Sequence, residues 1–207
     1  KVSNIAPAIA AAANDLILVK DSNVRLPAGH FTQLVSGLAP GTGMVCSVTV
    51  GVQPEGFPSE IECAMTNAHA APWLVGGSLV GLDIGFGKVM LFDRRDLERA
   101  GGIAVMASTF GDDHALAKAL RRVGLRTVFS ADVVHRVMGR RTLREVWDRQ
   151  LRWMMIRRDE SPLAFLAEPF FSAGAATLAA GLGGPSLGVP CWAAATTTNC
   201  CSPPPRP

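Results

Sequence analysis

The chain has 207 residues with a formal net charge of +3, and 48% of its residues are hydrophobic against 18% charged. This composition excludes a disordered chain, and the length favours one domain with a substantial core. Its mean hydropathy of +0.25 suggests contact with a membrane. Five scattered cysteines form neither a disulfide framework nor a zinc-binding spacing, so they indicate a reducing compartment.

Strand and helix signals alternate along the chain. Apolar runs predict strands at residues 15–20, 44–50, 86–92 and 126–134. Helical spacing and helix-ending residues predict helices at 6–14, 27–38, 59–69, 94–100, 112–123 and 142–158. This alternation predicts an α/β fold with a doubly wound sheet.

The first strand ends in Asp21-Ser22-Asn23. In open α/β sheets ligands bind at the carboxyl ends of strands. Two oxygen-bearing side chains two residues apart can share Mg²⁺ or Mn²⁺, which binds a diphosphate in turn. The alternative is a turn in which Asp21 and Asn23 stabilise their own backbone.

A second acidic motif, Asp112-Asp113, opens the helix predicted at residues 112–123. One interpretation is structural, with the acids capping the helix and interacting with its dipole. In the other, one carboxylate is a general base toward a hydroxyl nucleophile, and we assign Asp113 to that role.

Arginines crowd the last predicted helix. Between Arg136 and Arg158 eight arginines face only Glu145 and Asp148, which suits phosphate or anionic headgroups. Arg149 and Arg152 can neutralise a diphosphate, and Trp153 can stack on a flat ring or a bound acceptor. The alternative is a solvated basic face with an interfacial Trp. His69 alone carries little weight.

The C-terminal part is apolar and then low in complexity. Residues 170–195 carry no charge, and the basic amphipathic helix at 142–158 can lie at a membrane interface. We therefore expect a catalytic domain at 1–160, a membrane-associated segment at 161–195 and a disordered tail at 196–207.

Together these motifs resemble the ceramide glucosyltransferase family, particularly its bacterial, hopanoid-associated members. The resemblance runs over about residues 1–162 and rests on Asp21-Ser22-Asn23-Val24-Arg25, Asn67-Ala68-His69, Gly87-Lys88-Val89-Met90-Leu91-Phe92, Asp112-Asp113 and Arg149-Gln150-Leu151-Arg152-Trp153. This resemblance implies an inverting family 2 glycosyltransferase with a GT-A fold, that is, a doubly wound mixed sheet. The first strand and helix of that fold and its membrane helix have no counterpart here, so we expect a fragment, incomplete at the N-terminus.

The resemblance also implies roles. Asp21 and Asn23 would hold the metal, His69, Arg149, Arg152 and Trp153 would contribute to the donor site, and Asp113, with Asp112 in place of the usual Glu, would be the base. The substrates implied are a UDP-sugar and a lipid hydroxyl of ceramide or hopanoid type, and the location is the cytoplasmic face of the cytoplasmic membrane.

Two other functions stay open at this stage. A processive polysaccharide synthase shares the Arg-Trp motif type and would make a polymer. A non-catalytic module that binds anionic lipid is the second. Nucleic-acid binding is not expected, because the chain has no Tyr and few aromatic residues for base stacking.

Overall fold

The computed structural model describes residues 2–79, 81, 84–107, 111–160, 162–163 and 165–166. The chain divides into two compact units. The first comprises Lys1–Thr49 and Leu74–Arg136, and the second comprises Val50–Trp73 and Val137–Pro207. Each unit is described by itself.

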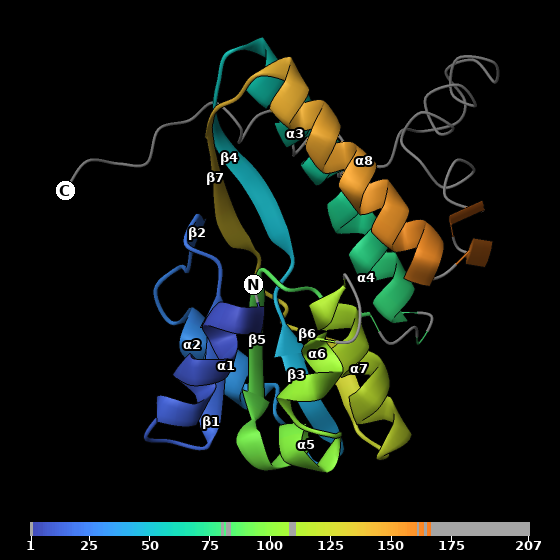
Figure 1. The fold of residues 1–207 in the computed structure, drawn as a ribbon. Helices are drawn as coiled ribbons and strands as arrows, with labels where there is room; N and C mark the ends of the chain where they lie inside the picture. Colours follow the sequence, from blue (N-terminus) through green and yellow to red (C-terminus); the bar gives the residue numbers. More distant parts are fainter. Residues whose placement is uncertain are drawn as a thin grey trace, which may run out of the picture. The chain divides into compact units, whose positions relative to one another are not determined.

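The first unit contains a four-stranded mixed sheet of order β1-β5-β3-β6 (Figure 1). The strands are β1 (Leu16–Lys20), β3 (Thr42–Cys46), β5 (Val89–Asp93) and β6 (Arg126–Phe129). Strand β5 is antiparallel to both of its neighbours, β1 and β3, whereas the neighbours β3 and β6 pair in parallel. The α/β class and the mixed sheet are as predicted. However, the inner strand β5 runs antiparallel to its two neighbours, so the sheet is not built throughout from parallel crossover units.

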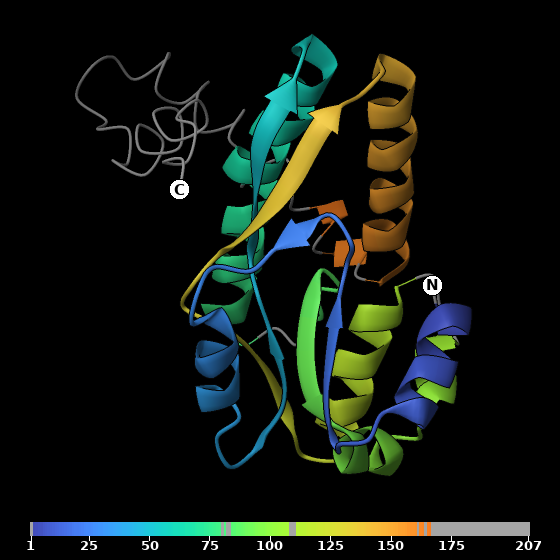
Figure 2. The same ribbon diagram turned by 90° about the vertical axis from the view of Figure 1, so that its left-hand side faces the viewer.

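Both faces of this sheet are covered, because side chains alternate between the faces along each strand. Met44 and Phe92 pack with helices α1 (Val2–Ala11), α5 (Arg94–Arg99), α6 (Ile103–Ala107) and α7 (Asp112–Arg122). Val45 and Leu91 face the other way and pack with Leu34 of α2 (His30–Ser36). Figure 2 shows α2 on one side of the strands and α1, α6 and α7 on the other. Burial on two faces explains why the strands read as continuous apolar runs.

One edge of the sheet collects several chain segments. Strands β1, β3 and β6 run in the same direction and end there, whereas the antiparallel β5 begins there. Backbone hydrogen bonds join these ends: Asp21 N donates to Lys88 O (3.0 Å), Ser47 N to Val89 O (3.3 Å) and Ser130 N to Cys46 O (2.8 Å). The residues that follow three strands and precede a fourth are thus fixed side by side.

In the second unit, helix α3 (Phe57–Met65) packs against α8 (Leu143–Glu160). Helix α3 continues into a π-helical turn, η1 (Thr66–Ala70). The boundaries between the units fall within strand β4 (Thr49–Glu55), helix α4 (Ala71–Leu79) and strand β7 (Val134–Arg140). In a three-stranded sheet, β7 pairs with β4 and with the short strand β2 (Val24–Arg25).

A capping box begins α8. Thr142 N donates to Glu145 Oε2 (2.8 Å), while Glu145 N donates to Thr142 Oγ1 (3.2 Å). The hydrogen bonds from Thr142 lower the pKa of the Glu145 carboxyl, the backbone bond contributing most. Reciprocal bonds of this kind satisfy N–H groups that lack a partner at a helix start, so the helix predicted at 142–158 is confirmed.

Three predicted strands are wrong in their extent. The run at 44–50 is divided between β3 and β4 at Ser47-Val48, and the run at 126–134 stops at Phe129, after which β7 begins at Val134. The strand predicted at 86–92 begins only at Val89. The apolar segment predicted at 161–195 lies almost wholly outside the described residues, as does the tail at 196–207. Among the residues that the structure describes, no helix is both long and apolar enough to cross a membrane.

Candidate active site

Asp21 lies directly after β1, at the sheet edge where the sequence places it. Its carboxylate Oδ2 accepts a hydrogen bond from the ammonium of Lys88, with which it forms an ion pair. The Asp21 and Lys88 side chains are 28% and 21% exposed, so the pair is partly shielded but open to a ligand. A carboxylate that holds a cation at a strand end is suited to organising phosphate groups.

Asp113 lies in the first turn of α7, whose N-cap is Gly111 with no side-chain cap. Neither aspartate is therefore the N-cap residue. Asp113 Oδ2 accepts from Gly87 N at 2.5 Å, and Oδ1 accepts from His114 N at 3.0 Å. These bonds fix the carboxylate in one orientation at a helix N-terminus, where the dipole favours negative charge.

Gly85 allows this approach. A Cβ atom built at Gly85 would lie 1.9 Å from the backbone oxygen of Asp113, a separation that no side chain tolerates. The loop before β5 and the start of α7 are therefore in direct backbone contact.

The two predicted aspartates meet at one short turn. Gly87 binds Asp113 and the next residue, Lys88, binds Asp21. Because these partners are consecutive, the structure brings the strand-end acid and the helix-opening acid to the same place. Asp112 is half-buried beside Asp113.

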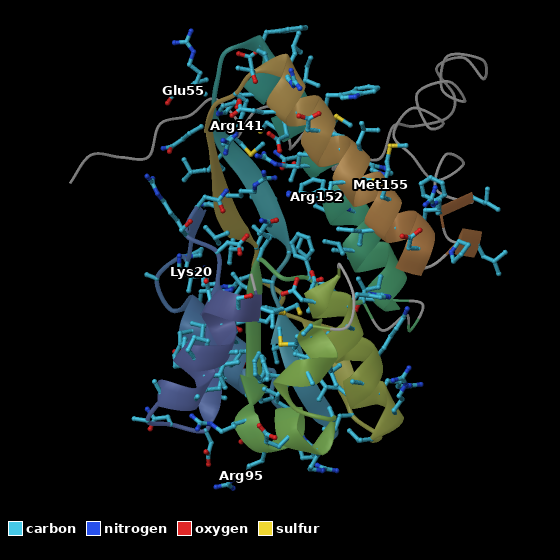
Figure 3. All side chains as sticks on the ribbon, viewed as in Figure 1. Lys20, Glu55, Arg95, Arg141, Arg152 and Met155 are labelled. Atoms are coloured by element: carbon cyan, nitrogen blue, oxygen red, sulfur yellow. The ribbon has the colours of Figure 1, made fainter. Side chains whose placement is uncertain are left out.

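Asn23 lies in the turn that follows Asp21, where Val24 N donates to Asp21 O at 3.2 Å. Its side chain is half-buried. Lys20 Nζ closes this turn by donating to Asp21 O (2.9 Å) and Val24 O (2.8 Å). Figure 3 labels Lys20. A turn thus follows Asp21, closed by Val24 N and by the Lys20 ammonium, which is a second cation at the sheet edge.

A buried histidine lies at the same edge. His30 Nε2 and Ser47 Oγ are 2.8 Å apart, and both residues are buried. Burial lowers the pKa of His30, with the charge of Asp132 acting in the opposite direction. Because neither group reaches solvent, we assign the pair to fixing the end of β3 against α2.

In the second unit, Arg149 points to a buried carboxylate. Its Nη1 lies 2.5 Å from Oε1 of Glu62, which is 0% exposed, whereas the Arg149 side chain is 20% exposed. Arg141 Nε lies 3.9 Å from the other oxygen, Oε2. Two arginines from the α8 region thus surround one carboxylate on α3.

The rest of the Arg-Trp motif lies further along α8. Arg152 is exposed and Trp153 is half-buried. Figure 3 labels Arg141 just before the helix and Arg152 within it. The arginines of this motif are therefore not equivalent, since Arg149 is committed to Glu62 and Arg152 faces solvent.

His69 lies half-buried in the π-helical turn η1. The turn is held by Asn67, whose side chain accepts from Gly51 N (2.7 Å) and donates to Gly51 O (3.1 Å). Single π-helical turns occur frequently at functional sites.

Lys88 and Glu62 were not predicted from the sequence. Lys88 stands within the quoted Gly87–Phe92 motif but received no role, and Glu62 has no local pattern around it. Their partners are 67 and 87 residues away.

Comparison with known families decides the identity of the chain. The model described as "Glycosyl transferase family 21" matches residues 1–202. The chain belongs to this family. It is similar to ceramide glucosyltransferase, as predicted, and the family that matches is family 21, where the resemblance in sequence implied family 2.

Individual relatives agree with this membership. Ceramide glucosyltransferase 1 of Caenorhabditis elegans is 24% identical over 172 residues, which cover 82% of this family 21 chain. The chain spans 37% of the length of that relative. A mannosyltransferase from Pyrobaculum calidifontis, described in complex with GDP-Man and Mn²⁺, has a similar fold. The match covers 96% of this chain and 58% of that one, with a TM-score of 0.53 and 20% identity. It supports a fold of the GT-A type.

Proposed function

We propose that this chain transfers a hexosyl unit, glucose or N-acetylglucosamine, from a UDP-sugar to the hydroxyl of a ceramide-type or hopanoid-type lipid, with inversion. The observation that carries the proposal is the Gly87-Lys88 turn, which holds Asp113 and Asp21 on adjacent residues. A transferase needs a base and a charged diphosphate site close together, and this turn supplies both.

Asp113 is the base of the proposed reaction. As the acceptor oxygen bonds to the anomeric carbon, its proton passes to the Asp113 carboxylate, and the electron pair of the breaking bond leaves with UDP. A single displacement inverts the anomeric centre. The hydrogen bonds from Gly87 and His114 hold this carboxylate in a fixed orientation, and an ionised carboxylate can accept about four hydrogen bonds.

The exposed Arg152 is the better candidate for a diphosphate ligand, and Trp153 for stacking on the acceptor. Arg149, because it binds Glu62, contributes by holding α8 on α3. His69 stays a predicted donor-site residue.

The predicted Mg²⁺ or Mn²⁺ does not fit the described residues as they are arranged. Hard cations prefer several oxygen ligands. Here Asp21 is the single carboxylate of the pair, Asn23 is neutral, and the Asp21 oxygen already binds the ammonium of Lys88. No group of three or more acidic, His or Cys side chains able to hold a metal occurs among the described residues. The proposed reaction therefore takes no step through a metal.

We propose further that α8 lies on the cytoplasmic face of the cytoplasmic membrane, where a lipid acceptor can enter. Four exposed apolar residues recur at intervals of four along the helix: Leu143, Trp147, Leu151 and Met155. Residues at this spacing form one stripe, and an interfacial Trp is favoured at the headgroup level. Arg144 and Arg158 are exposed on the same helix.

The test of the proposed function is sugar transfer by the full chain in lipid–detergent micelles. Radiolabelled UDP-glucose or UDP-N-acetylglucosamine is supplied with ceramide or a hopanoid alcohol, and the lipid product is counted and sized. We expect one sugar per lipid; a polymer would indicate the synthase instead. Asp113→Asn should lower turnover by about 10²–10⁴-fold with UDP binding retained, whereas Glu98→Gln, on the exposed part of α5, should not. Normal turnover in Asp113→Asn would refute the base assignment.

A further inference from the structure

Lys88 is doubly tied to Asp21. Its backbone oxygen accepts from Asp21 N at 3.0 Å, and its ammonium binds the Asp21 carboxylate. The backbone bond extends the pairing of β1 and β5, in which Lys20 lies opposite Val89. The ammonium is thus placed by the sheet itself and then oriented by the carboxylate.

The residue that precedes Lys88 in the chain contacts the proposed base. Gly87, which precedes Lys88, binds the Asp113 carboxylate. Lys20 brings a second ammonium to the turn that follows Asp21. Hydrogen bonds at this sheet edge therefore tie the carboxylates of Asp21 and Asp113 to the Gly87-Lys88 turn, and the Lys20 ammonium to the backbone after Asp21.

A cation at this place can do what a divalent metal does for a departing diphosphate. A metal ion stabilises the negative charge that develops on the leaving oxygens. A lysine ammonium is a compact point charge with three donors, and it binds phosphate in the same way. A divalent cation placed on the Asp21 oxygen would instead face the Lys88 ammonium at close range, with like charges opposed.

We propose that Lys88 supplies the positive charge for the diphosphate of the donor, and that Asp21 positions this ammonium instead of ligating a divalent metal. The inference rests on the proposed function, since it concerns the same leaving group. When the sugar–phosphate bond breaks, its electron pair stays on the diphosphate oxygen, which accepts a hydrogen bond from the ammonium. No proton, oxidant or further reactant is needed.

Binding of UDP measures this role directly. Isothermal titration calorimetry of the full chain with UDP is run in EDTA and again in Mn²⁺, and Mn²⁺ binding alone is followed by electron paramagnetic resonance. For the wild type we expect similar UDP affinity in both buffers and no tight Mn²⁺ site. Lys88→Met should weaken UDP binding in EDTA by about 10-fold to 100-fold, the loss of one charge-assisted hydrogen bond. Mn²⁺ should restore part of the affinity, because Asp21 is then released for a metal.

Two further variants separate charge from folding. Lys88→Arg keeps a cation and should retain most of the binding in EDTA. Lys118→Met removes an exposed lysine from α7 and should change nothing. If Lys88→Met is poorly folded by circular dichroism, the wild-type comparison of EDTA with Mn²⁺ still decides the question.

The outcomes distinguish this inference from the proposed function. Transfer and UDP binding by the wild type that vanish in EDTA would overturn the role of Lys88 and leave glycosyl transfer standing. Unchanged UDP affinity of Lys88→Met in EDTA would overturn it as well. Failure of the wild type to bind UDP or transfer sugar in either buffer would overturn both.

Discussion

The ion pair between Glu62 and Arg149 should be a main support of the second unit, and its two halves should not be equivalent. Glu62 is fully buried, whereas Arg149 is 20% exposed and Arg141 is 24% exposed. Breaking a buried pair costs about 3–5 kcal/mol, because the remaining charge stays buried without compensation. Which charge remains therefore decides the magnitude.

Removal of the arginine should cost more. In Arg149→Met the fully buried carboxylate loses its close ion-pair partner, whereas Arg141 lies 3.9 Å away, so we expect the free energy of unfolding to fall by about 3–5 kcal/mol. In Glu62→Gln the remaining charges are the partly exposed arginines, which can turn toward water. The expected loss there is smaller, about 3 kcal/mol, at the low end of the same range.

Urea unfolding measures both losses. The unfolding is monitored by far-ultraviolet circular dichroism and by tryptophan fluorescence, to which Trp147 and Trp153 on α8 contribute. Glu60→Gln is the control, because Glu60 is an exposed acid on the same helix as Glu62. The double variant Glu62→Gln with Arg149→Met removes both charges of the pair, so no charge is left without its partner. Its loss of unfolding free energy should therefore be smaller than the sum of the two single losses. Additive losses, or single losses under about 1 kcal/mol, would show that the ion pair does not stabilise the second unit.

Three other perturbations test the rest of the arrangement. Gly85→Ala should displace the start of α7 and lower turnover through Asp113, with a lower melting temperature; an unchanged variant would contradict the 1.9 Å approach. Burial lowers the pKa of His30, so the unfolded chain binds the proton more readily than the folded chain. Stability should therefore fall as pH drops below the ordinary histidine value of about 6.5. In a pH series of melting temperatures, His30→Gln should flatten that slope, and the same slope in the variant would refute the assignment. The Glu145 carboxyl has a lowered pKa, so its support of α8 is present above the ordinary glutamate value of about 4.3 and is lost as pH falls through the lower, folded value. Thr142→Ala should remove this acid-sensitive part of the helical circular dichroism signal, and a signal that keeps its pH dependence would count against the capping box.

The sequence predicts features whose causes are local. Helix α7 is marked by acids at its start and a glycine after its end, and α8 by apolar residues at helical spacing. Strand β1 is an apolar run followed by polar residues. In each case a few neighbouring residues determine the conformation, so the helix or strand can be predicted from one short segment of the sequence.

Features that depend on partners distant in the chain were missed. The residues at 44–50 have the composition of one strand, and only the end of the pairing with β5 at Cys46 shows where the chain passes to β4. The direction of β5 cannot be read from its own residues. Lys88 and Glu62 are ordinary charged residues until the fold brings Asp21 and Arg149 to them, 67 and 87 residues away.

The two long-range pairs act on the proposed chemistry in different ways. Glu62 takes Arg149 out of the set of cations available to a substrate, although the sequence groups it with Arg152. Asp21 holds Lys88 in place without burying it, because both side chains remain more than a fifth exposed. A cation fixed before the donor binds loses little rotational freedom on binding, which is how a preorganised site lowers the barrier to charge separation. The acid at the end of β1, which the sequence suggests as a metal ligand, is on this reasoning more effective as the partner that keeps one lysine aimed at the leaving group.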